Sequence, residues 1–499
     1  MKFASALLMA AAAVLVQPVD AQMGAPGSQP AAMPAAAGPL AAKYKVDADK
    51  ILAAAMTDND GYAALTYLCD HVGKRLSGSP QLNSAVDWGA ELMKKAGLEN
   101  VKVQPVMVPH WVRGGESAAL VGPVTKPLHM LGLGMSVGTP KEGITAEVLF
   151  VPSFAALDAI PAEKVKGKIV VFNPGWQGYG VGSMYRTGGA SRAAAKGAAA
   201  MLVRSATGLA MQTPHTGTLR YDEKQPKIPA AAISVEDALL IERLAKEGPV
   251  QVHLQMDAHL EAEVKAGNVM GEIVGSEHPE QVVVLGGHID SWDVGQGAQD
   301  DGGGIMATFE AVSLIHKLGL KPKRTIRVVF WVNEENGGAG GRAYREMIGD
   351  KIGDQVAAIE MDGGAEKPLG IGYGGFGGPR RPTPGAAAPA AAPELTAEEK
   401  QSYVMMRDIA ALLGSIGADT VSPGGGGSDI GPLTADAVPS LSPRTVGDHY
   451  FDWHHTEADT LDKVDVDSFR KNTGMLSVVA FVLADMDGRL AGRKSAVRE

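Results

Sequence analysis

One short stretch of the chain combines acidic and histidine side chains in a pattern that can bind cations. Residues 285–304 read LGGHIDSWDVGQGAQDDGGG and contain one histidine, four aspartates and seven glycines. They follow directly on QVVVL, which is typical of a buried strand. Carboxylates removed from water repel one another, so several of them at a partly buried sheet edge need cations between them. The stretch therefore predicts a metal site.

Three further segments carry ligand types of the same kind. They read FWVNEENGG, IEMDGG and HYFDWHHTEADT, the first two at the ends of apolar runs and the third on a loop. Because open α/β sheets place their sites at the carboxyl ends of the strands, we expect these side chains to meet His288 at one sheet edge. The residues brought together in this way are Glu334, Glu335, Asp362, His454 and His455.

The ligand types favour zinc. Two imidazoles among carboxylates are better suited to zinc than to calcium or magnesium. If Asp300 bridges two zinc ions, each ion has three protein ligands and one open position, which is the catalytic rather than the structural arrangement. The remaining ligands of the two ions are then His288 with Asp362, and Glu335 with His455.

Two neighbouring carboxylates fit supporting roles. Asp290 lies two residues from His288, and on an extended backbone it shares a face with it, so its carboxylate can accept the imidazole N–H and orient the ring. Glu334 is not needed as a metal ligand in this assignment. A carboxylate beside an activated water is a natural general base, which takes the water proton and later returns it to a leaving amine. We interpret the set as a centre for amide hydrolysis.

Each of these residues has an ordinary explanation when it is taken alone. Strand-end histidines, helix N-caps such as Asp301, and exposed acidic loops are all common. Ligand counting also leaves Asp300 interchangeable with Asp301, and His455 with His454. The arrival of suitable ligand types at consecutive strand ends is what favours a metal centre over these explanations.

The elements that position these residues alternate between strand and helix. From residue 281 onward the segments QVVVLGG, IMATFEAVSLIHKLG, RTIRVVFWV, GRAYREMIG and VAAIEMD follow one another. This order predicts an α/β fold with a mainly parallel central sheet flanked by helices. Residues 118–262 are rich in Gly, Val and Ala with short strand patterns, so we expect an inserted β-rich domain there. The catalytic domain then comprises 43–117 and 263–499.

Length and composition indicate a large globular protein. The chain has 499 residues, 45% of them hydrophobic, and a net charge of −10 without a basic block. A two-domain core is therefore expected, and nucleic acid is not expected as a partner. Cys69 is the only cysteine, which excludes an intramolecular disulfide. Its neighbours Tyr67 and Leu68 predict a buried helical thiol.

Three segments outside the periodic regions have their own signatures. Residues 1–21 combine Lys2, an apolar run and a small-residue site, which predicts a secretory signal peptide cut after Ala21. The apolar run is shorter than the roughly 20 residues that span a bilayer, so we expect a secreted or periplasmic protein without a stable membrane span. Residues 22–42 are interpreted as a Pro/Ala-rich linker without a packing pattern, and 379–400 as a surface loop.

The motifs together resemble a known family. GGHIDSWDVGQGAQDDGGG, VVFWVNEENGG, AAIEMDGG and HHTEADT, with PHTGTLRYDEKQPKIPAAAISVEDA outside the site, are similar to the co-catalytic zinc aminopeptidase family, and within it to the carboxypeptidase Q group. The resemblance covers nearly the whole chain after the linker. It implies a zinc exopeptidase fold, two zinc ions per chain, a short peptide substrate and a homodimer. It also implies that residues 118–262 form a protease-associated domain.

The resemblance also assigns roles to individual residues. It implies that Asp300 is the bridging ligand, that His455 rather than His454 is the histidine ligand, and that Glu334 is the catalytic acid/base. The implied zinc ligands are His288, Asp300, Glu335, Asp362 and His455.

We therefore expect an exported di-zinc metallo-exopeptidase that hydrolyses dipeptides or removes terminal residues from short peptides. Its nucleophile would be a hydroxide that bridges the zinc ions. Two alternatives from other functional classes remain at this point. One is an acyltransferase with a single zinc ion, similar to a glutaminyl cyclase, which shares much of the same residue set. The other is a non-catalytic binding protein on the same fold, although such a chain would be expected to have lost ligands.

Overall fold

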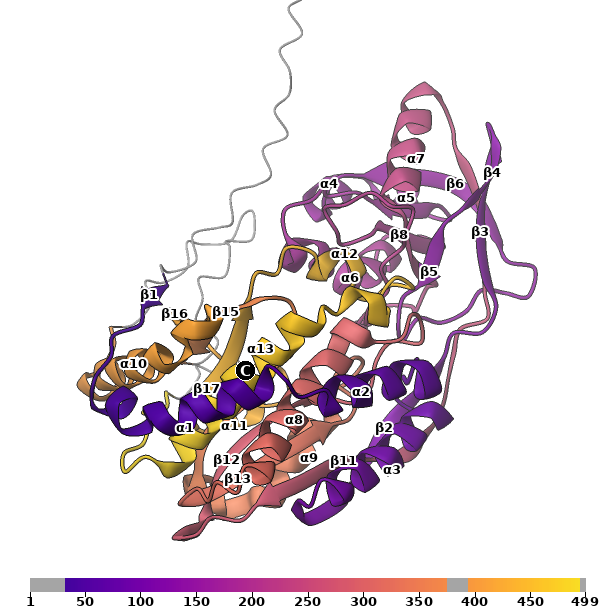
Figure 1. Cartoon of the computed structure of the whole chain (residues 1–499). Coiled ribbons are helices and arrows are strands. Elements are labelled where there is room, and N and C mark those ends of the chain that lie inside the picture. Colours follow the sequence, from indigo (N-terminus) through magenta and orange to yellow (C-terminus); the bar gives the residue numbers. More distant parts are fainter. Residues whose placement is uncertain (1–31, 375–393, 494–499) are drawn as a thin grey trace, which may run out of the picture.

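Two β-sheets organise the chain in the computed structural model, which describes residues 32–374 and 394–493. Figure 1 shows the smaller sheet, with its helices, as a separate layer beyond one end of the larger sheet. The larger sheet has the strand order β1 (Met33–Pro34), β16 (Thr420–Pro423), β15 (Pro368–Tyr373), β17 (Ser440–Thr445), β14 (Gln355–Glu360), β12 (His278–His288), β13 (Arg324–Trp331), β11 (His259–Ile273) and β2 (Glu99–Val112).

The larger sheet is parallel at its centre. Strands β17, β14, β12 and β13 pair in parallel, whereas β11 and β2 pair antiparallel on one side. Residues 282–288 of β12 are fully buried, as expected for a central strand that is covered on both faces. The predicted α/β fold with flanking helices is confirmed, and the antiparallel pairs lie toward the edges of the sheet.

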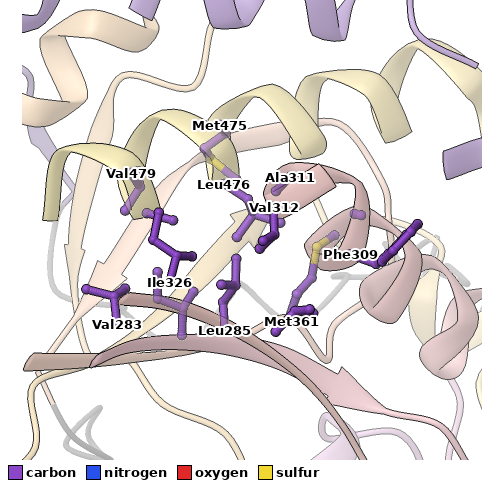
Figure 2. Close-up of a cluster of buried hydrophobic side chains, with 14 of the residues drawn as sticks. Val283, Leu285, Phe309, Ala311, Val312, Ile326, Met361, Met475, Leu476 and Val479 are labelled. Atoms are coloured by element: carbon purple, nitrogen blue, oxygen red, sulfur yellow. The ribbon is translucent and has the colours of Figure 1, made fainter. Parts of the chain in front are cut away.

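Helices cover both faces of this sheet. In Figure 2, Val312 of α8 and Leu476 of α13 lie over Leu285 and Ile326 on one face of the sheet. Burying each large apolar side chain of this kind stabilises the fold by roughly 1.5–3 kcal/mol. The helices of this domain are α1 (Pro39–Ala55), α2 (Asp60–Tyr67), α3 (Pro80–Lys95), α8 (Gly303–Lys317), α9 (Ala339–Ile348), α10 (Ala397–Ala410), α11 (Gly431–Ala435), α12 (Tyr450–Trp453) and α13 (Val466–Asp485).

The inserted segment forms the smaller sheet and has apolar cores of its own. Its strand order is β4 (Thr125–Leu128), β3 (Glu116–Gly122), β10 (Gln251–Met256), β6 (Ile144–Val151), β7 (Ile169–Phe172), β8 (Ala200–Arg204), β9 (Ala230–Ile233) and β5 (Met130–Gly132). Its helices are α4 (Phe154–Asp158), α5 (Ala162–Val165), α6 (Tyr179–Ala194) and α7 (Val235–Glu247). The insertion of a β-rich domain is confirmed, and the insert also contains helix α6, which its glycine and alanine content obscured in the sequence.

The prediction that residues 22–42 form a linker is wrong for residues 32–42, the part of this segment that the structure describes. Residues 33–34 form β1, which pairs with β16, and α1 begins at Pro39. Proline suits the first turn of a helix because its missing N–H has no partner there. The carboxylate of Asp408 accepts hydrogen bonds from the backbone N–H groups of Gly38, Leu40 and Ala41, so a distant helix caps α1. The predicted signal peptide, residues 1–21, lies outside the described residues.

The loop predicted for residues 379–400 is also too long. Residues 375–393 lie outside the described part, but α10 begins at Ala397. Thr396 and Glu399 form a reciprocal capping box at its start, which is a local signal for a helix N-terminus.

Two other predictions concern single features. Cys69 lies in a π-helical turn (Leu68–Val72) with 2% of its surface exposed, and burial raises the pKa of its thiol to about 12. The predicted buried helical thiol is therefore confirmed. Within residues 32–374 and 394–493, no helix has the length and apolar character needed to cross a bilayer.

Candidate metal centre

The carboxyl ends of β12, β13 and β14 deliver three of the predicted ligands to one place. His288 is the last residue of β12, Glu335 follows the end of β13, and Asp362 follows the end of β14. Asp300 lies in the turn before α8, and His455 follows the short helix α12. The structure therefore brings all five predicted ligands together from separate parts of the chain.

One group of ligand atoms surrounds His288. Its Nε2 lies 3.2 Å from Oδ1 of Asp300 and 3.6 Å from Oδ1 of Asp362. These three residues form a set that could hold one metal ion. His288 is fully buried, whereas the side chain of Asp362 is 21% exposed. We call this set the first metal position.

A second group surrounds His455. Its Nε2 lies 3.1 Å from Oδ2 of Asp300 and 3.1 Å from Oε2 of Glu335. Asp300 thus presents one carboxylate oxygen to each histidine, and its side chain is only 5% exposed. We call Asp300, Glu335 and His455 the second metal position.

The residues fit zinc. Ligand atoms about 2.1 Å from one tetrahedral zinc ion lie about 3.4 Å from one another. The separations of 3.1–3.6 Å within the two positions agree with that value. In addition, three buried atoms at the centre lack a hydrogen-bond partner, although buried polar atoms are normally satisfied. They are Nε2 of His288, Oδ2 of Asp300 and Oε1 of Glu335.

Asp300 and Asp301 point to different places. Oδ2 of Asp301 accepts a hydrogen bond from the backbone N–H of His288, behind the metal positions. A Cβ at Gly287 or Gly304 would lie 2.0 or 2.1 Å from an oxygen of that carboxylate. These two glycines therefore leave room for the Asp301 side chain. Asp301 supports the backbone of a ligand, and Asp300 faces both positions.

His454 and His455 both lie close to Asp300, so ligand counting alone does not separate them. Their rings stack with centroids 3.5 Å apart, and Nε2 of His454 is 3.4 Å from Oδ2 of Asp300. His454 is therefore within reach of the same carboxylate oxygen. Only His455 also faces Glu335, since its Nε2 is 3.1 Å from that carboxylate. His455 adopts a left-handed backbone conformation, with φ of 63°, which is uncommon for a residue other than glycine.

The predicted role of Asp290 requires correction. Nδ1 of His288 lies 2.9 Å from the backbone carbonyl of Asp290, whereas its distance to the Asp290 carboxylate is 3.8 Å. A carbonyl can only accept, so Nδ1 carries the proton and the lone pair of Nε2 faces the first metal position. The ring is thus oriented by the main chain. A tight turn after β12 brings this carbonyl, rather than the side chain, to the imidazole.

The carboxylate of Asp290 instead holds the segment that carries Glu334 and Glu335. It accepts hydrogen bonds from the backbone N–H of Glu334 at 3.1 Å, from that of Glu335 at 3.4 Å, and from the Ser77 hydroxyl at 3.2 Å. Asp290 is fully buried. It therefore fixes both Glu334 and Glu335 through their main chain.

This arrangement predicts the effect of Asp290→Asn. An amide has one acceptor oxygen where the carboxylate has two, so at least one buried N–H loses its partner at a cost of about 1–3 kcal/mol. We expect a lower unfolding free energy in urea and at least a tenfold lower kcat. Ser77→Ala removes only one of the three hydrogen bonds and should have a smaller effect on both. Equal stability of Asp290→Asn and the parent chain would show that the predicted contacts do not hold the segment.

Asp459 supports the site but was not identified from the sequence. Asp459 lies within the HHTEADT motif, and its carboxylate accepts the backbone N–H groups of Gln299 at 2.7 Å and Asp300 at 3.1 Å. It therefore holds the backbone at Asp300 in place. Burial raises the pKa of Asp459 to about 7, although these hydrogen bonds oppose the rise. Asp459 could have been singled out in the sequence because it lies in the same motif as His455.

Glu334 lies at the more accessible side of the centre. Burial raises the pKa of its carboxyl to about 7, with His288 opposing the rise, and the Ser428 hydroxyl forms a hydrogen bond with it. Glu334 and Asp362 are half-buried and Ser428 is exposed, whereas His288, Asp300 and Glu335 are buried. The side of the centre formed by Glu334, Asp362 and Ser428 is therefore its more exposed side.

The charge of the centre favours a cation. In the described part of the chain, every ion pair formed by Asp300, Glu335 and Asp362 is with a histidine. Burial raises the pKa of Glu335 well above its ordinary value, and Asp300 adds to the rise. Burial also lowers the pKa of His455. Burial acts in the same direction on His288, but Asp300 and Asp362 raise the pKa of its imidazole well above the ordinary value. Buried carboxylates whose ion-pair partners are imidazoles form a donor set suited to a metal ion.

Comparisons with known proteins agree with this geometry. Residues 268–480 match the model of peptidase family M28, and residues 135–241 match the PA domain. Carboxypeptidase Q of Mus musculus is 40% identical over 433 residues, which are 87% of this chain and 87% of that protein. The human carboxypeptidase Q gives the same values. The chain belongs to peptidase family M28. The predicted resemblance to the co-catalytic zinc aminopeptidases and to carboxypeptidase Q is confirmed.

Solved structures of family M28 support the same assignment. The peptidase M28 precursor from Shewanella amazonensis has a TM-score of 0.80 and 32% identity, and covers 90% of this chain and 98% of that one. A zinc aminopeptidase from Bacillus subtilis has a TM-score of 0.62 at 19% identity, covering 86% and 96%, and shares the fold.

The 40% identity with carboxypeptidase Q over 87% of both chains favours one of the functional classes considered above. The chain is a metallopeptidase related to carboxypeptidase Q, with an inserted PA domain. A metallo-exopeptidase is thus favoured over both a cyclase-like acyltransferase and a binding protein without activity.

Proposed function

We propose that the chain is an exported di-zinc exopeptidase that hydrolyses dipeptides or removes terminal residues from short peptides. One observation carries the proposal: Asp300 presents one oxygen to His288 at 3.2 Å and the other to His455 at 3.1 Å. A carboxylate in that position is suited to bridge two ions. The other ligands would be Asp362 at the first position and Glu335 at the second.

The chain's own residues account for the proton transfers of the reaction. When bound, the two zinc ions would supply Lewis acidity toward the scissile carbonyl and lower the pKa of a water molecule. Glu334 is placed to take one proton from the attacking water. It then returns this proton to the amide nitrogen as the C–N bond breaks, which leaves a free amine and a carboxylic acid whose remaining proton is released to solvent. The carboxylate of Asp290 holds Glu334 in position by accepting a hydrogen bond from the backbone N–H of Glu334.

Further parts of the proposal concern assembly and location. Residues 118–262 are proposed as the bounds of the PA insert, between catalytic segments 43–117 and 263–499. The N-terminal pattern supports export with cleavage after Ala21. A homodimer is proposed on the resemblance alone. Light scattering on the mature chain would determine the mass in solution, and N-terminal sequencing of the exported protein would locate the cleavage site.

Metal content and substrate specificity together test the proposed activity. Zinc per chain is measured on the purified mature protein by atomic emission, in parallel with hydrolysis of a dipeptide panel whose termini are free, N-acetylated or amidated. We expect two zinc ions per chain and cleavage that is lost when one particular terminus is blocked. Cleavage within long peptides blocked at both ends would contradict the exopeptidase proposal.

A further inference from the structure

We propose that the PA insert is a structural part of the second metal position and sets its affinity for zinc. This inference rests on the proposed two-metal function and assigns positioning roles to residues of the insert. Three residues carry it: Arg186 on α6, and Thr216 and Thr218 on the segment between β8 and β9. We call these three residues the insert clasp.

Thr216 contacts the metal ligand His455 twice through its main chain. Its backbone N–H donates to the carbonyl of His455 at 3.0 Å, and its own carbonyl lies 3.2 Å from Nδ1 of the imidazole. Because a carbonyl only accepts, Nδ1 carries the proton and the lone pair of Nε2 faces Asp300 and Glu335. Thr216 therefore sets both the position and the tautomer of the ligand. Such hydrogen bonds to ligand histidines commonly tune metal affinity.

Thr218 contacts the other ligand of the same position. Its hydroxyl donates to the backbone carbonyl of Glu335 at 2.7 Å. The two ligands that only the second position uses, Glu335 and His455, are thus both hydrogen-bonded to one segment of the insert. That segment spans three residues, so a shift of it would move both ligands together.

Arg186 fixes this segment from inside the insert. Arg186 is 8% exposed as a whole residue. Its Nη1 donates to the carbonyl of Thr216 at 2.9 Å, and its Nη2 donates to the Tyr179 hydroxyl at 2.7 Å. Nη1 also lies 3.3 Å from Nδ1 of His455. With the proton on Nδ1 both of these nitrogens are donors, so this is a close contact rather than a hydrogen bond, and the Thr216 carbonyl is the acceptor. A carbonyl oxygen has two lone pairs, so one Thr216 oxygen can accept from both Arg186 and His455.

The described hydrogen bonds of His288, at the first metal position, do not involve the insert. The described hydrogen bonds of His288 come from residues of the catalytic domain, namely the carbonyl of Asp290 at 2.9 Å and the carboxylate of Asp301 at 3.1 Å. The two positions therefore differ in what holds them. One is supported by the turn after β12, and the other by a segment of a different domain, which predicts two zinc affinities with unequal dependence on the insert.

The test measures zinc affinity directly. The double variant Arg186→Met/Thr218→Val is prepared metal-free in the full mature chain and titrated with zinc against a chromophoric chelator. Replacement of residues that hydrogen-bond to metal ligands typically lowers affinity about 10- to 100-fold. We expect one of the two zinc ions to bind 10- to 100-fold more weakly, and the other to keep the affinity that it has in the parent chain.

Matched variants separate this effect from general damage to the insert. Arg192→Met removes another arginine of α6, one that pairs with Asp158 on the surface. Thr139→Val removes another threonine hydroxyl that bonds within the insert, to Met256. Both should bind two zinc ions with parental affinities. Thr218→Val alone should weaken the same zinc ion, whereas Thr218→Ser keeps the hydroxyl that bonds to Glu335 and should keep the parental affinity. Circular dichroism of each metal-free variant checks that it is folded.

The outcomes distinguish this inference from the proposed function. A parent chain that binds two zinc ions, with unchanged affinities in the folded double variant, overturns the inference alone. An equal loss at both positions also overturns it, because the clasp contacts ligands of one position only. A parent chain that binds fewer than two zinc ions overturns the two-metal function and the inference with it. Selective weakening of one ion in the double variant and in Thr218→Val, with parental affinity in Thr218→Ser, supports both.

Discussion

Replacing Glu334 with glutamine is expected to lower kcat by about 10²- to 10⁴-fold, the usual contribution of a positioned general acid/base. Glutamine keeps the size of the side chain and its hydrogen bond with Ser428, but it cannot take a proton from water. Glu334 is outside both metal positions, so the zinc content should remain that of the parent chain. Steady-state kinetics on a cleaved dipeptide and atomic emission on the same sample measure the two quantities.

A second Glu→Gln variant provides the control. Glu457 lies in the same motif as His455 but is exposed, so Glu457→Gln should keep both the rate and the metal content. Loss of zinc from Glu334→Gln would mean that this carboxylate acts as a ligand. A rate within a few-fold of the parent would remove Glu334 from the proton transfer altogether.

The convergence of the candidate ligands could be predicted because the positions of strand ends follow from simple rules. Parallel strands that alternate with helices bring their carboxyl ends to one edge, and the residues after each apolar run are readable in the sequence. His288, Glu335 and Asp362 follow from this argument alone. Asp300 and His455 needed the resemblance, because two adjacent aspartates and two adjacent histidines carry no local signal that tells which one turns inward.

The supporting contacts could not be predicted because they depend on tertiary structure. The carboxylate of Asp408 caps a helix that begins 369 positions earlier in the chain, at Pro39. The main chain of Thr216 orients His455 from another domain. Backbone carbonyls and N–H groups are the same for every residue type, so no pattern of side chains marks them. The Asp290 carboxylate was assigned to the wrong partner for this reason.

Replacing Asp300 with asparagine is expected to remove zinc from both positions. The carboxylate contributes one oxygen to each set, and an amide nitrogen turned toward either ion has no lone pair to offer. Neutralising it also leaves only one carboxylate at each position to balance a divalent ion. We expect less than one zinc ion per chain after dialysis and no detectable dipeptide hydrolysis.

Asp301→Asn is the informative comparison for this variant. Its carboxylate bonds the backbone of His288 and faces neither position, so this variant should still bind two zinc ions. An equal loss of metal from Asp300→Asn and Asp301→Asn would point to collapse of the turn before α8 rather than to loss of a bridge. Retention of two zinc ions by Asp300→Asn would show that the two positions do not share this carboxylate.

Stability provides a reading that does not depend on catalysis. A site that binds only the folded chain stabilises it by about 2.7 kcal/mol when free zinc is 100 times its Kd. The parent chain should therefore unfold at a clearly higher temperature with zinc than with a chelator. Asp300→Asn should show little of this difference, because neither of its positions keeps a complete ligand set. Asp301→Asn keeps the ligands of both metal positions, so zinc should still raise its unfolding temperature. This holds even if the altered contact with the His288 backbone lowers the unfolding temperature measured without zinc.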